Sequence, residues 1–348
     1  MKTKAAILIK TGEPLHLVEI EIPELKPGQV LIDLAYSGVC HTQILETRGR
    51  RGEDKYLPHC LGHEGSGVVR QIGPRVTKVK PGDKVILSWM KGSGADVPST
   101  VYDWNGQKVN SGAITTFSRQ SVISENRLTV INKNISMKEA ALLGCAVATG
   151  LGAVFNTAQP KPGQSLAIFG TGGIGSCSIL GANIAGCNPI IAIDINEEKL
   201  AFAKKMGATH CINSLTSNVI EEIKAIVPEG LDFAIESSGI PQVMLQAIHS
   251  VKNQGGTAVI IGNARHGELL NLDPHQLNLG KKILGTWGGD NIPDKDFPAY
   301  MGLIEAGKLK LDELTSKSYK LDQINNVLDD LENGKVLRPL IDMELNLD

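Results

Sequence analysis

The chain has 348 residues, which at about 150 residues per domain predicts roughly two domains. With 42% hydrophobic and 21% charged residues it can bury a sizeable core, which excludes a disordered or collagen-like polymer. The net charge of −2 excludes a strong electrostatic case for nucleic-acid binding, and no apolar run is long enough to span a bilayer. Six cysteines in this length do not predict a disulfide scaffold, and the apolar stretch near the start is too short for a signal peptide. We therefore expect a cytoplasmic protein without nucleic-acid or membrane partners.

The first part of the chain has the pattern of a β-rich domain. Short apolar or alternating segments, separated by turn signals such as Gly-Glu-Pro and Lys-Pro-Gly, occur at 5–10, 15–20, 30–37, 67–72 and 84–87. Residues 91–112 are polar and glycine-rich, which predicts an excursion loop. Residues 113–131 return to strand-like character.

The pattern changes near residue 137, where helical spacing begins and continues to 155. Strand-like apolar segments then alternate with helical ones, at 165–169, 190–194, 210–212, 233–236, 257–261 and 282–284. This alternation predicts an α/β domain with a parallel sheet covered on both faces. Short helices at 296–306 and 321–333 and a strand near 339–343 predict that the tail returns to the first domain.

A glycine-rich turn, FGTGGIG, joins the strand-like segment at 165–169 to a helical segment. Gly170, Gly172 and Gly175 fit the spacing G-x-G-x-x-G of a dinucleotide-binding turn, in which the helix N-terminus faces the pyrophosphate. Asp194 ends the next strand-like segment, where a carboxylate bonds the adenosine ribose and repels a 2′-phosphate. The motif therefore favours NAD over NADP. The alternatives are a ligand-free turn and an ordinary carboxylate that caps the next helix.

Three separate segments contain possible zinc ligands. These are Cys40 in GVCHT, the pair Cys60 and His63 in CLGHEGSG, and Cys145 in LGCAV. Spacing alone makes Cys60 and His63 the natural pair, although a lone cysteine is more often a small buried hydrophobe than a ligand. From spacing, the existence of a metal site stays open.

The stretch from Gly62 to Gly67, with its continuation through Pro81-Gly82-Asp83-Lys84-Val85, resembles the zinc signature of the medium-chain alcohol dehydrogenases. Residues 38–42, 110–127, 144–150, the glycine motif and 334–338 are similar to the same family in the same order. The resemblance implies a GroES-like β-rich catalytic domain at 1–146 and 287–348. It also implies a Rossmann doubly wound cofactor domain, with a parallel sheet, at 147–286.

The same resemblance implies roles for individual residues. Cys40, His63 and Cys145 would bind one catalytic zinc per subunit, and Cys60 would be a neighbour of the site. Thr42 and Glu64 would be catalytic: Thr42 would take the substrate proton, and Glu64 would lie behind the zinc as a nearby carboxylate or an alternative ligand. Trp89 would line the substrate pocket. His41 and Arg338 would meet the pyrophosphate, Thr149 the nicotinamide and Lys199 the ribose. The remaining residues expected to bind the cofactor are Gly170, Gly172, Gly173, Ile174, Gly175, Asp194, Ile261 and Trp287.

The sequence also departs from the family pattern. Residues 86–144 contain no cysteine, so we expect no structural zinc and a replacement of its lobe by 91–112. Gln43 stands where many members have an aspartate that orients the zinc-bound histidine, and Leu45 where some have a relay histidine. Four basic residues lie between two of the ligand segments: Arg48, Arg50, Arg51 and Lys55. They would bind an anionic or sugar-like substrate or, as we favour, lie on the solvated surface of the protein.

These observations predict a zinc-dependent alcohol dehydrogenase. It would transfer hydride reversibly between NAD and a small primary or secondary alcohol, with a polyol or sugar-like compound as an option, and would form a homodimer or homotetramer. One alternative is a zinc-free NAD(P)H reductase of the same superfamily. The other is an NAD-binding redox-sensing regulatory protein, suggested by the cysteines outside the triad.

Overall fold

The computed structural model describes residues 1–315 and 317–345, which form two compact units. The first unit comprises Met1–Cys145 and Ile292–Asp348, and the second comprises Ala146–Asn291. Residues 146 and 287–291, expected in the first domain, belong to the second unit, where the amide of Asn291 donates to the carbonyl of Ala148.

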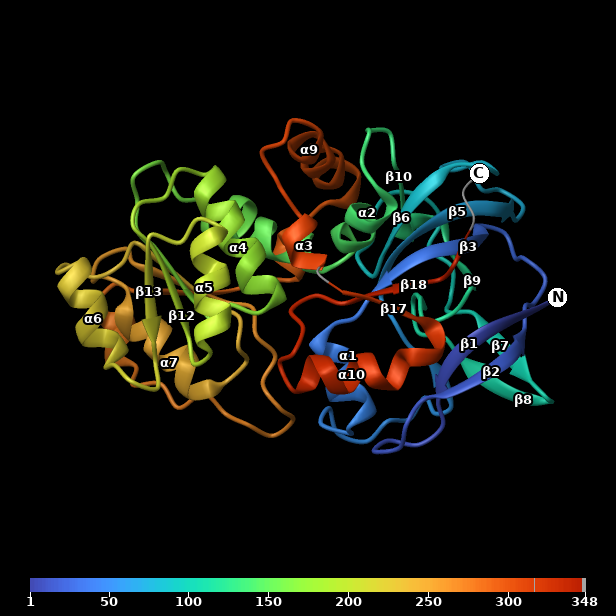
Figure 1. Cartoon of the computed structure of the whole chain (residues 1–348), viewed down its shortest axis with the longest axis horizontal. Coiled ribbons are helices and arrows are strands. Elements are labelled where there is room, and N and C mark those ends of the chain that lie inside the picture. Colours follow the sequence, from blue (N-terminus) through green and yellow to red (C-terminus); the bar gives the residue numbers. More distant parts are fainter. Residues whose placement is uncertain (316, 346–348) are drawn as a thin grey trace. The chain divides into compact units, whose positions relative to one another are not determined.

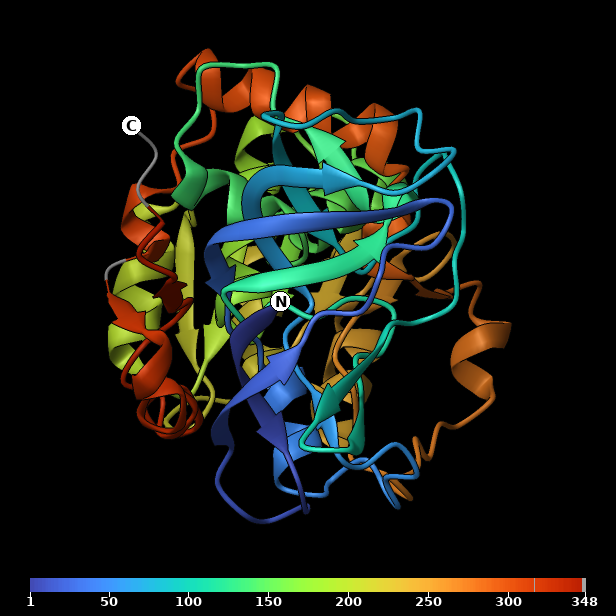
Figure 2. The same cartoon turned by 90° about the vertical axis from the view of Figure 1, so that its right-hand side faces the viewer.

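The first unit is built on two sheets (Figure 1). Its strands are β1 (Lys2–Leu8), β2 (His16–Glu21), β3 (Gln29–Gly38), β4 (His59–Cys60), β5 (Glu64–Ile72), β6 (Lys84–Ser88), β7 (Val101–Trp104), β8 (Gln107–Asn110), β9 (Gln120–Ser124), β10 (Leu128–Val130), β17 (Ser318–Lys320) and β18 (Leu340–Asp342). Strands β1, β2, β7, β8 and β4 close into a barrel, while a seven-stranded sheet runs in the order β10-β6-β5-β3-β18-β17, with β9 also paired to β3. Figure 2 shows these strands in a view turned by 90°.

The segment 91–112 is not a simple excursion loop, and that expectation was wrong. Its second half forms the hairpin of β7 and β8, which completes the barrel. Asn105 and Gly106 at its turn both have positive φ, as the tight Asn-Gly hairpin turn requires. The first half is fastened by the buried carboxylate of Glu125, which accepts hydrogen bonds from the backbone N–H groups of Thr77, Lys78 and Ala95.

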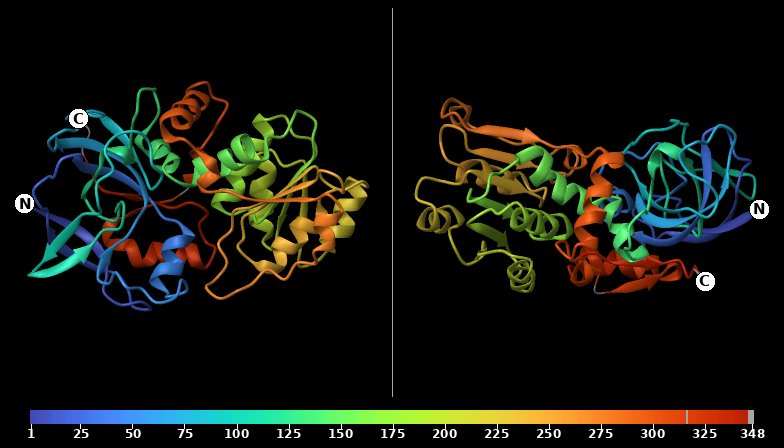
Figure 3. Two further views of the ribbon diagram at one scale, coloured as in Figure 1. Left: turned by 180° about the vertical axis from the view of Figure 1, so that it is seen from behind. Right: turned by 90° about the horizontal axis from the view of Figure 1, so that it is seen from above.

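Short helices complete the first unit: α1 (His41–Thr47), η1 (Glu125–Arg127), α2 (Met137–Leu143), α9 (Pro293–Glu305), η4 (Asp312–Thr315), η5 (Leu321–Gln323) and α10 (Ile324–Glu332). The tail returns as expected, since β18 pairs antiparallel with β3 and parallel with β17. Helix α10 (red) lies beside α1 (blue) in Figures 1 and 3, although about 280 residues separate them. The C-terminal segment therefore supports the helix that follows Cys40.

The second unit contains a six-stranded parallel sheet in the order β13-β12-β11-β14-β15-β16, which confirms the doubly wound fold. Its strands are β11 (Leu166–Phe169), β12 (Ile190–Asp194), β13 (His210–Asn213), β14 (Phe233–Glu236), β15 (Thr257–Ile260) and β16 (Lys282–Gly285). Its helices are α3 (Ala146–Gly152), η2 (Ala153–Ala158), α4 (Gly173–Ile184), α5 (Glu197–Lys205), α6 (Val219–Ile226), α7 (Pro241–Ser250), α8 (His275–Asn278) and η3 (Gly288–Asp290). The central strands are almost wholly buried, which explains why they appear in the sequence as continuous apolar runs.

Among the described residues, no single helix is long and apolar enough to cross a membrane. The bent pair formed by α2 and residues 146–158 passes that test of length and composition only when its two parts are taken together.

Candidate metal centre and nucleotide-binding loop

Three side chains from distant segments meet in the first unit. The sulfur atoms of Cys40 and Cys145 and a ring nitrogen of His63 all lie within 4.8 Å of one another. Both cysteines are buried and the histidine is partly buried. Two thiolates and one imidazole are a donor set that suits zinc, and three protein ligands leave a fourth tetrahedral position for substrate. The residues present therefore fit the expected metal.

Local backbone geometry explains how these residues converge. Cys40 follows β3 and is the N-cap of α1, while His63 follows a glycine with φ of +90° and precedes β5. The single helix expected from 137 to 155 is interrupted, since α2 ends at Leu143 and α3 begins at Ala146. A Cβ at Gly144 would collide with the carbonyl oxygen of Leu87, so the close approach of this bend to β6 requires glycine. The interruption places Cys145 at the cluster.

The two thiols share one environment. The pKa of Cys40 is lowered well below its ordinary value because the Cys145 thiol donates to its sulfur, with further help from the charge of Arg338. The pKa of Cys145 is correspondingly raised because it retains the shared proton. A positive ion between the sulfur atoms would remove this competition, since metal ligands bind as thiolates.

A buried ion pair lies against the cluster. The Glu64 carboxylate and the Arg338 guanidinium are in direct contact, with 0% and 5% of their side chains exposed. Burial alone would lower the pKa of Arg338, but the charges of Glu64, Cys40 and Cys145 raise it, so the guanidinium remains charged. A Cβ at Gly38 would collide with the Glu64 carboxylate, so the chain leaves room for this acid behind the site. Arg338 thus bonds a protein carboxylate, while its expected contact with pyrophosphate remains a prediction.

Helix α1 carries the polar groups nearest to Cys40. The Thr42 hydroxyl accepts a weak hydrogen bond from the Cys40 thiol, with 3.8 Å between sulfur and oxygen. Gln43 is 1% exposed, and its amide accepts from the backbone N–H of Cys40 and contacts the Nδ1 atom of His63. His41 is exposed at the first position of the helix. The sequence placed Gln43 near the histidine but gave no sign that it also binds Cys40.

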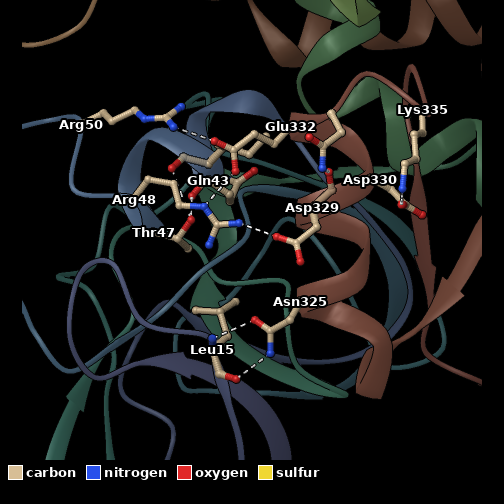
Figure 4. Close-up of polar contacts among 12 residues, drawn as sticks. Leu15, Gln43, Thr47, Arg48, Arg50, Asn325, Asp329, Asp330, Glu332 and Lys335 are labelled. Atoms are coloured by element: carbon tan, nitrogen blue, oxygen red, sulfur yellow. Dashed lines mark hydrogen bonds and ion pairs between the residues drawn. The ribbon is translucent and has the colours of Figure 1, made fainter.

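The other end of α1 is held by ion pairs (Figure 4). Arg48 and Arg50 both bond Glu332 of α10, and Arg48 also bonds Asp329. Arg51 bonds Glu46 within the first unit. These three arginines are therefore paired with acids of the chain itself, which agrees with the expectation that they are surface groups.

Trp89 directly follows β6 and is partly buried. Its backbone N–H donates to the carbonyl of His63, at 3.2 Å, and its own carbonyl accepts from the Arg127 guanidinium. Cys60 is directed elsewhere: it belongs to the apolar cluster of the barrel, and burial raises its pKa to about 12. Among the described residues the ligand cluster contains Cys40, His63 and Cys145 and omits Cys60, so the pair that spacing alone made natural is not part of it.

In the second unit, the three glycines of the turn meet different steric demands. Gly170 has φ of +86°, and a Cβ at Gly175 would collide with the Gly170 carbonyl oxygen. A Cβ at Gly172 would have no atom within 4 Å. Gly173 and Ile174 begin α4, whose N-cap Gly172 offers no side chain to the free N–H groups. The turn therefore leaves open space and unsatisfied donors at a helix N-terminus, which suits a phosphate group.

Asp194 fastens this turn. One carboxylate oxygen accepts from the backbone N–H and the hydroxyl of Thr171, and the other accepts from the N–H groups of Ile195 and Asn196. The alternative role for Asp194, a cap on the next helix, is taken by Asn196, which accepts from the N–H of Lys199. Asp194 lies at the carboxyl edge of the sheet, where nucleotides bind in doubly wound folds.

Further expected cofactor residues lie near the same edge. The Thr149 hydroxyl is buried without a hydrogen-bond partner, and α3, which carries it, packs against α4. Ile261 follows β15 and donates its N–H to the Glu236 carbonyl, whereas Trp287 follows β16 and is 78% exposed. An unpartnered buried hydroxyl on a helix that packs against α4 suits a hydrogen bond to a bound cofactor.

Glu236, at the end of β14, was not predicted from the sequence. One oxygen of its fully buried carboxylate accepts from the N–H and hydroxyl of Ser238 and from the N–H of Gly239, which shapes the turn after the strand. Burial raises its pKa, against the effect of these donors. The signal that could have indicated it is an acid that ends an apolar strand before Ser-Ser-Gly, just as Asp194 ends the apolar strand β12.

Comparison with known proteins gives two family matches. Residues 26–133 match the alcohol dehydrogenase GroES-like domain, and residues 173–306 match the zinc-binding dehydrogenase domain. The chain is 34% identical to the S-(hydroxymethyl)glutathione dehydrogenase of a Synechocystis strain over 98% of this chain and 100% of that protein. It is 35% identical, with the same coverage, to the enzyme of that name from Escherichia coli.

Solved structures agree with these matches. An alcohol dehydrogenase zinc-binding domain protein from Burkholderia ambifaria is similar with a TM-score of 0.92 and 30% identity, covering 99% of this chain and 100% of that one. Benzyl alcohol dehydrogenase from Acinetobacter calcoaceticus has a TM-score of 0.90 at 30% identity, covering 98% and 99%. The fold, the ligand cluster and these relatives define a zinc-dependent dehydrogenase. The chain belongs to the zinc-containing medium-chain alcohol dehydrogenase family, and is an oxidoreductase that acts on CH–OH groups.

Proposed function

We propose that this enzyme uses NAD and one catalytic zinc per subunit to interconvert a primary alcohol and its aldehyde. The observation that carries the proposal is the meeting of Cys40, His63 and Cys145 within 4.8 Å. A zinc-free reductase would have no need of two buried thiols and an imidazole around one centre. The lack of cysteine between 86 and 144 supports a single zinc without a structural partner.

The residues around the proposed zinc site would have separate chemical roles. Cys40, His63 and Cys145 would hold zinc, which when bound supplies a Lewis acid for the substrate oxygen. The Thr42 hydroxyl, already within reach of the Cys40 sulfur, would accept the proton that leaves the alcohol. The Glu64 and Arg338 pair would fix the charge behind the ligands.

The second unit would hold the nucleotide. The N–H groups at the start of α4 would bind the pyrophosphate over Gly172, and the unpartnered hydroxyl of Thr149 would bind the nicotinamide, which accepts hydride when present. The Asp194 carboxylate would accept from the ribose hydroxyls and repel a 2′-phosphate, which supports NAD rather than NADP. Lys199, His41 and the backbone at Ile261 and Trp287 keep their expected roles as part of the proposal.

For the substrate we propose an uncharged primary alcohol with a bulky group. The relatives named above act on S-(hydroxymethyl)glutathione and benzyl alcohol, and both substrates carry a hydroxymethyl group. Arg48, Arg50 and Arg51 form ion pairs with acids of the chain itself, so their charges are already neutralised. This favours a neutral substrate such as benzyl alcohol over an anionic one such as S-(hydroxymethyl)glutathione. Trp89, next to His63, would line the pocket.

A direct test combines metal analysis with a substrate panel. We expect one zinc per purified chain and reduction of NAD, with little reduction of NADP, by benzyl alcohol in preference to ethanol, a polyol or S-(hydroxymethyl)glutathione. Metal-free protein with full activity would refute the zinc function. A clear preference for NADP or for a polyol would refute the corresponding part of the proposal.

The proposal includes self-association and a cytoplasmic location. Strand β16 is an edge strand with Leu284 37% exposed, so two copies could pair their sheets as a homodimer, and two dimers as a tetramer. Thiols that bind zinc must stay reduced, as in the cytoplasm. Light scattering measures the molar mass of the wild type and of Leu284→Lys in solution. If the β16 edges pair, the wild type should be a dimer or tetramer and the variant should dissociate into smaller species.

A further inference from the structure

We propose that Gln43 sets how tightly this site holds zinc, because its single amide oxygen must serve two hydrogen-bond donors in the metal-bound state. The inference rests on the proposed function only in taking zinc as the metal held by Cys40, His63 and Cys145. Gln43 is 1% exposed and its amide contacts Cys40 and His63, so its role is that of a positioning residue that acts through His63.

The orientation of the Gln43 amide is determined by its neighbours. Its Oε1 atom accepts from the backbone N–H of Cys40 at 2.9 Å, and its Nε2 atom lies 2.5 Å from Nδ1 of His63. A backbone N–H can only donate, so it selects the oxygen end of the amide. The amino end therefore faces Nδ1 of the histidine, in a position that is 1% exposed to solvent.

This arrangement suits the metal-free histidine. The amino group of Gln43 donates to Nδ1, so the neutral imidazole of His63 carries its proton on Nε2. Nδ1 is occupied by the amide, which leaves Nε2 as the ring nitrogen for the metal. A neutral imidazole that binds zinc through Nε2 carries its proton on Nδ1 and needs an acceptor there.

Zinc binding therefore changes Nδ1 of His63 from a hydrogen-bond acceptor into a donor. If the amide of Gln43 stays in place, two donors, its amino group and the Nδ1–H of His63, face each other. If it turns over, the buried N–H of Cys40 loses its acceptor and faces the amino group instead. Either outcome leaves two donors that face each other without an acceptor in a buried site, and this loss arises only when the metal is bound.

A carboxylate at this position would not have this conflict. Its two oxygen atoms would accept from Cys40 and His63 at the same time, with the geometry that the glutamine already occupies. Glutamine thus stabilises the formed, metal-free site and weakens the metal-bound one. We infer a zinc that exchanges more readily than it would beside a carboxylate.

The test compares the zinc dissociation constants of the wild type and Gln43→Glu by competition with a coloured chelator. We expect Gln43→Glu to bind zinc about 10- to 100-fold more tightly, the range typical of residues that orient a ligand histidine. Gln29→Glu is a matched control: Gln29 is a 3% exposed glutamine of the same unit that also bridges two groups, the N–H of Lys26 and the hydroxyl of Thr100. It should lose stability and leave zinc affinity unchanged.

Two spectroscopic readouts separate positioning from a general structural effect. The cobalt-loaded proteins should keep their thiolate-to-metal absorption, because Cys40 and Cys145 still bind. In ¹⁵N-histidine NMR of the wild type, the His63 proton should sit on Nε2 without metal and on Nδ1 with zinc. A metal-free wild type with the proton already on Nδ1 would overturn the inference, whether or not the variant folds.

Equal or weaker zinc binding by folded Gln43→Glu would also overturn it. Wild-type protein that binds no zinc at all would refute the proposed function instead, so the two failures are distinguishable.

Discussion

In the metal centre the functional atoms belong to side chains from three separate segments, whereas the nucleotide-binding turn offers backbone N–H groups from one continuous segment. Cys40, His63 and Cys145 depend on the packing of several strands and on an interrupted helix. The turn between β11 and α4 depends on glycines that leave space. The first site should therefore be sensitive to what a side chain is, and the second to whether a side chain is present.

The largest effect should come from removing one ligand. Cys145→Ser should lose its zinc and at least about 10³-fold in kcat/KM, because a Lewis acid contributes several kcal/mol to this chemistry. Metal analysis and steady-state kinetics measure both losses. Cys60→Ser is the control, since Cys60 lies outside the cluster, and it should retain zinc. Zinc loss in both variants alike would contradict the assignment of ligands.

The next effect tests a hydroxyl beside the ligands. Thr42→Ala should lower kcat by about 10²- to 10⁴-fold, the usual contribution of a positioned proton acceptor, without loss of zinc. Thr42→Ser restores the hydroxyl and should recover most of the rate. If Thr42→Ala retained full activity, proton transfer would have to use another group.

A pair of glycine variants sharpens the comparison in the second unit. Gly175→Ala should destabilise the protein by about 1–3 kcal/mol because its Cβ would collide with the Gly170 carbonyl. Gly172→Ala should unfold at the same temperature as the wild type, since its Cβ would have no protein atom within 4 Å. The same Cβ would occupy the space proposed for the pyrophosphate, so the variant should bind NAD about tenfold more weakly, which equals about 1.4 kcal/mol. Calorimetry and fluorescence titration check the two. Unchanged NAD affinity in Gly172→Ala would mean that the pyrophosphate lies elsewhere.

The smallest effect concerns the acid that holds α10 to β17. The Tyr319 hydroxyl, with Lys317 and Lys335, lowers the pKa of Asp330 from 3.8 to about 2. A lowered pKa in the folded state stabilises the fold above pH 4 and loses that effect as the pH falls toward 2. Asp330→Asn should therefore unfold slightly earlier than wild type in urea at pH 6, with a difference that shrinks toward pH 2. A difference independent of pH would rule out this charge effect.

Much of the fold follows from local pattern. The strands expected at 190–194 and 233–236 coincide with β12 and β14, because buried parallel strands are short apolar runs bounded by turns. The predictions failed where local signals were overridden or overlooked. The Asn-Gly hairpin signal at 105–106 was present but unused, and the helical pattern from 137 to 155 gave no sign of the interruption at Gly144.

The candidate site divides in the same way. The glycine turn is contiguous, so its spacing indicated the dinucleotide-binding fold directly. The cysteine ligands were indicated by family resemblance, since spacing by itself favoured Cys60 as the partner of His63. The pairing of Arg48 and Arg50 with Glu332 joins segments about 280 residues apart, and no local pattern reveals such a contact.

The sequence alone determined most of the order of strands and helices, but not the hairpin of β7 and β8 or the break between α2 and α3. It also determined the nucleotide-binding turn and the family, because these depend on periodicity, glycine positions and short motifs along the chain. The tertiary structure brought the two cysteines that the resemblance indicated to the histidine. Only the tertiary structure decided that Glu64 pairs with Arg338 and that one amide of Gln43 lies between Cys40 and His63. Hydrogen bonds and metal coordination act over a few ångströms in space. Folding, rather than proximity in sequence, brings these groups within that range.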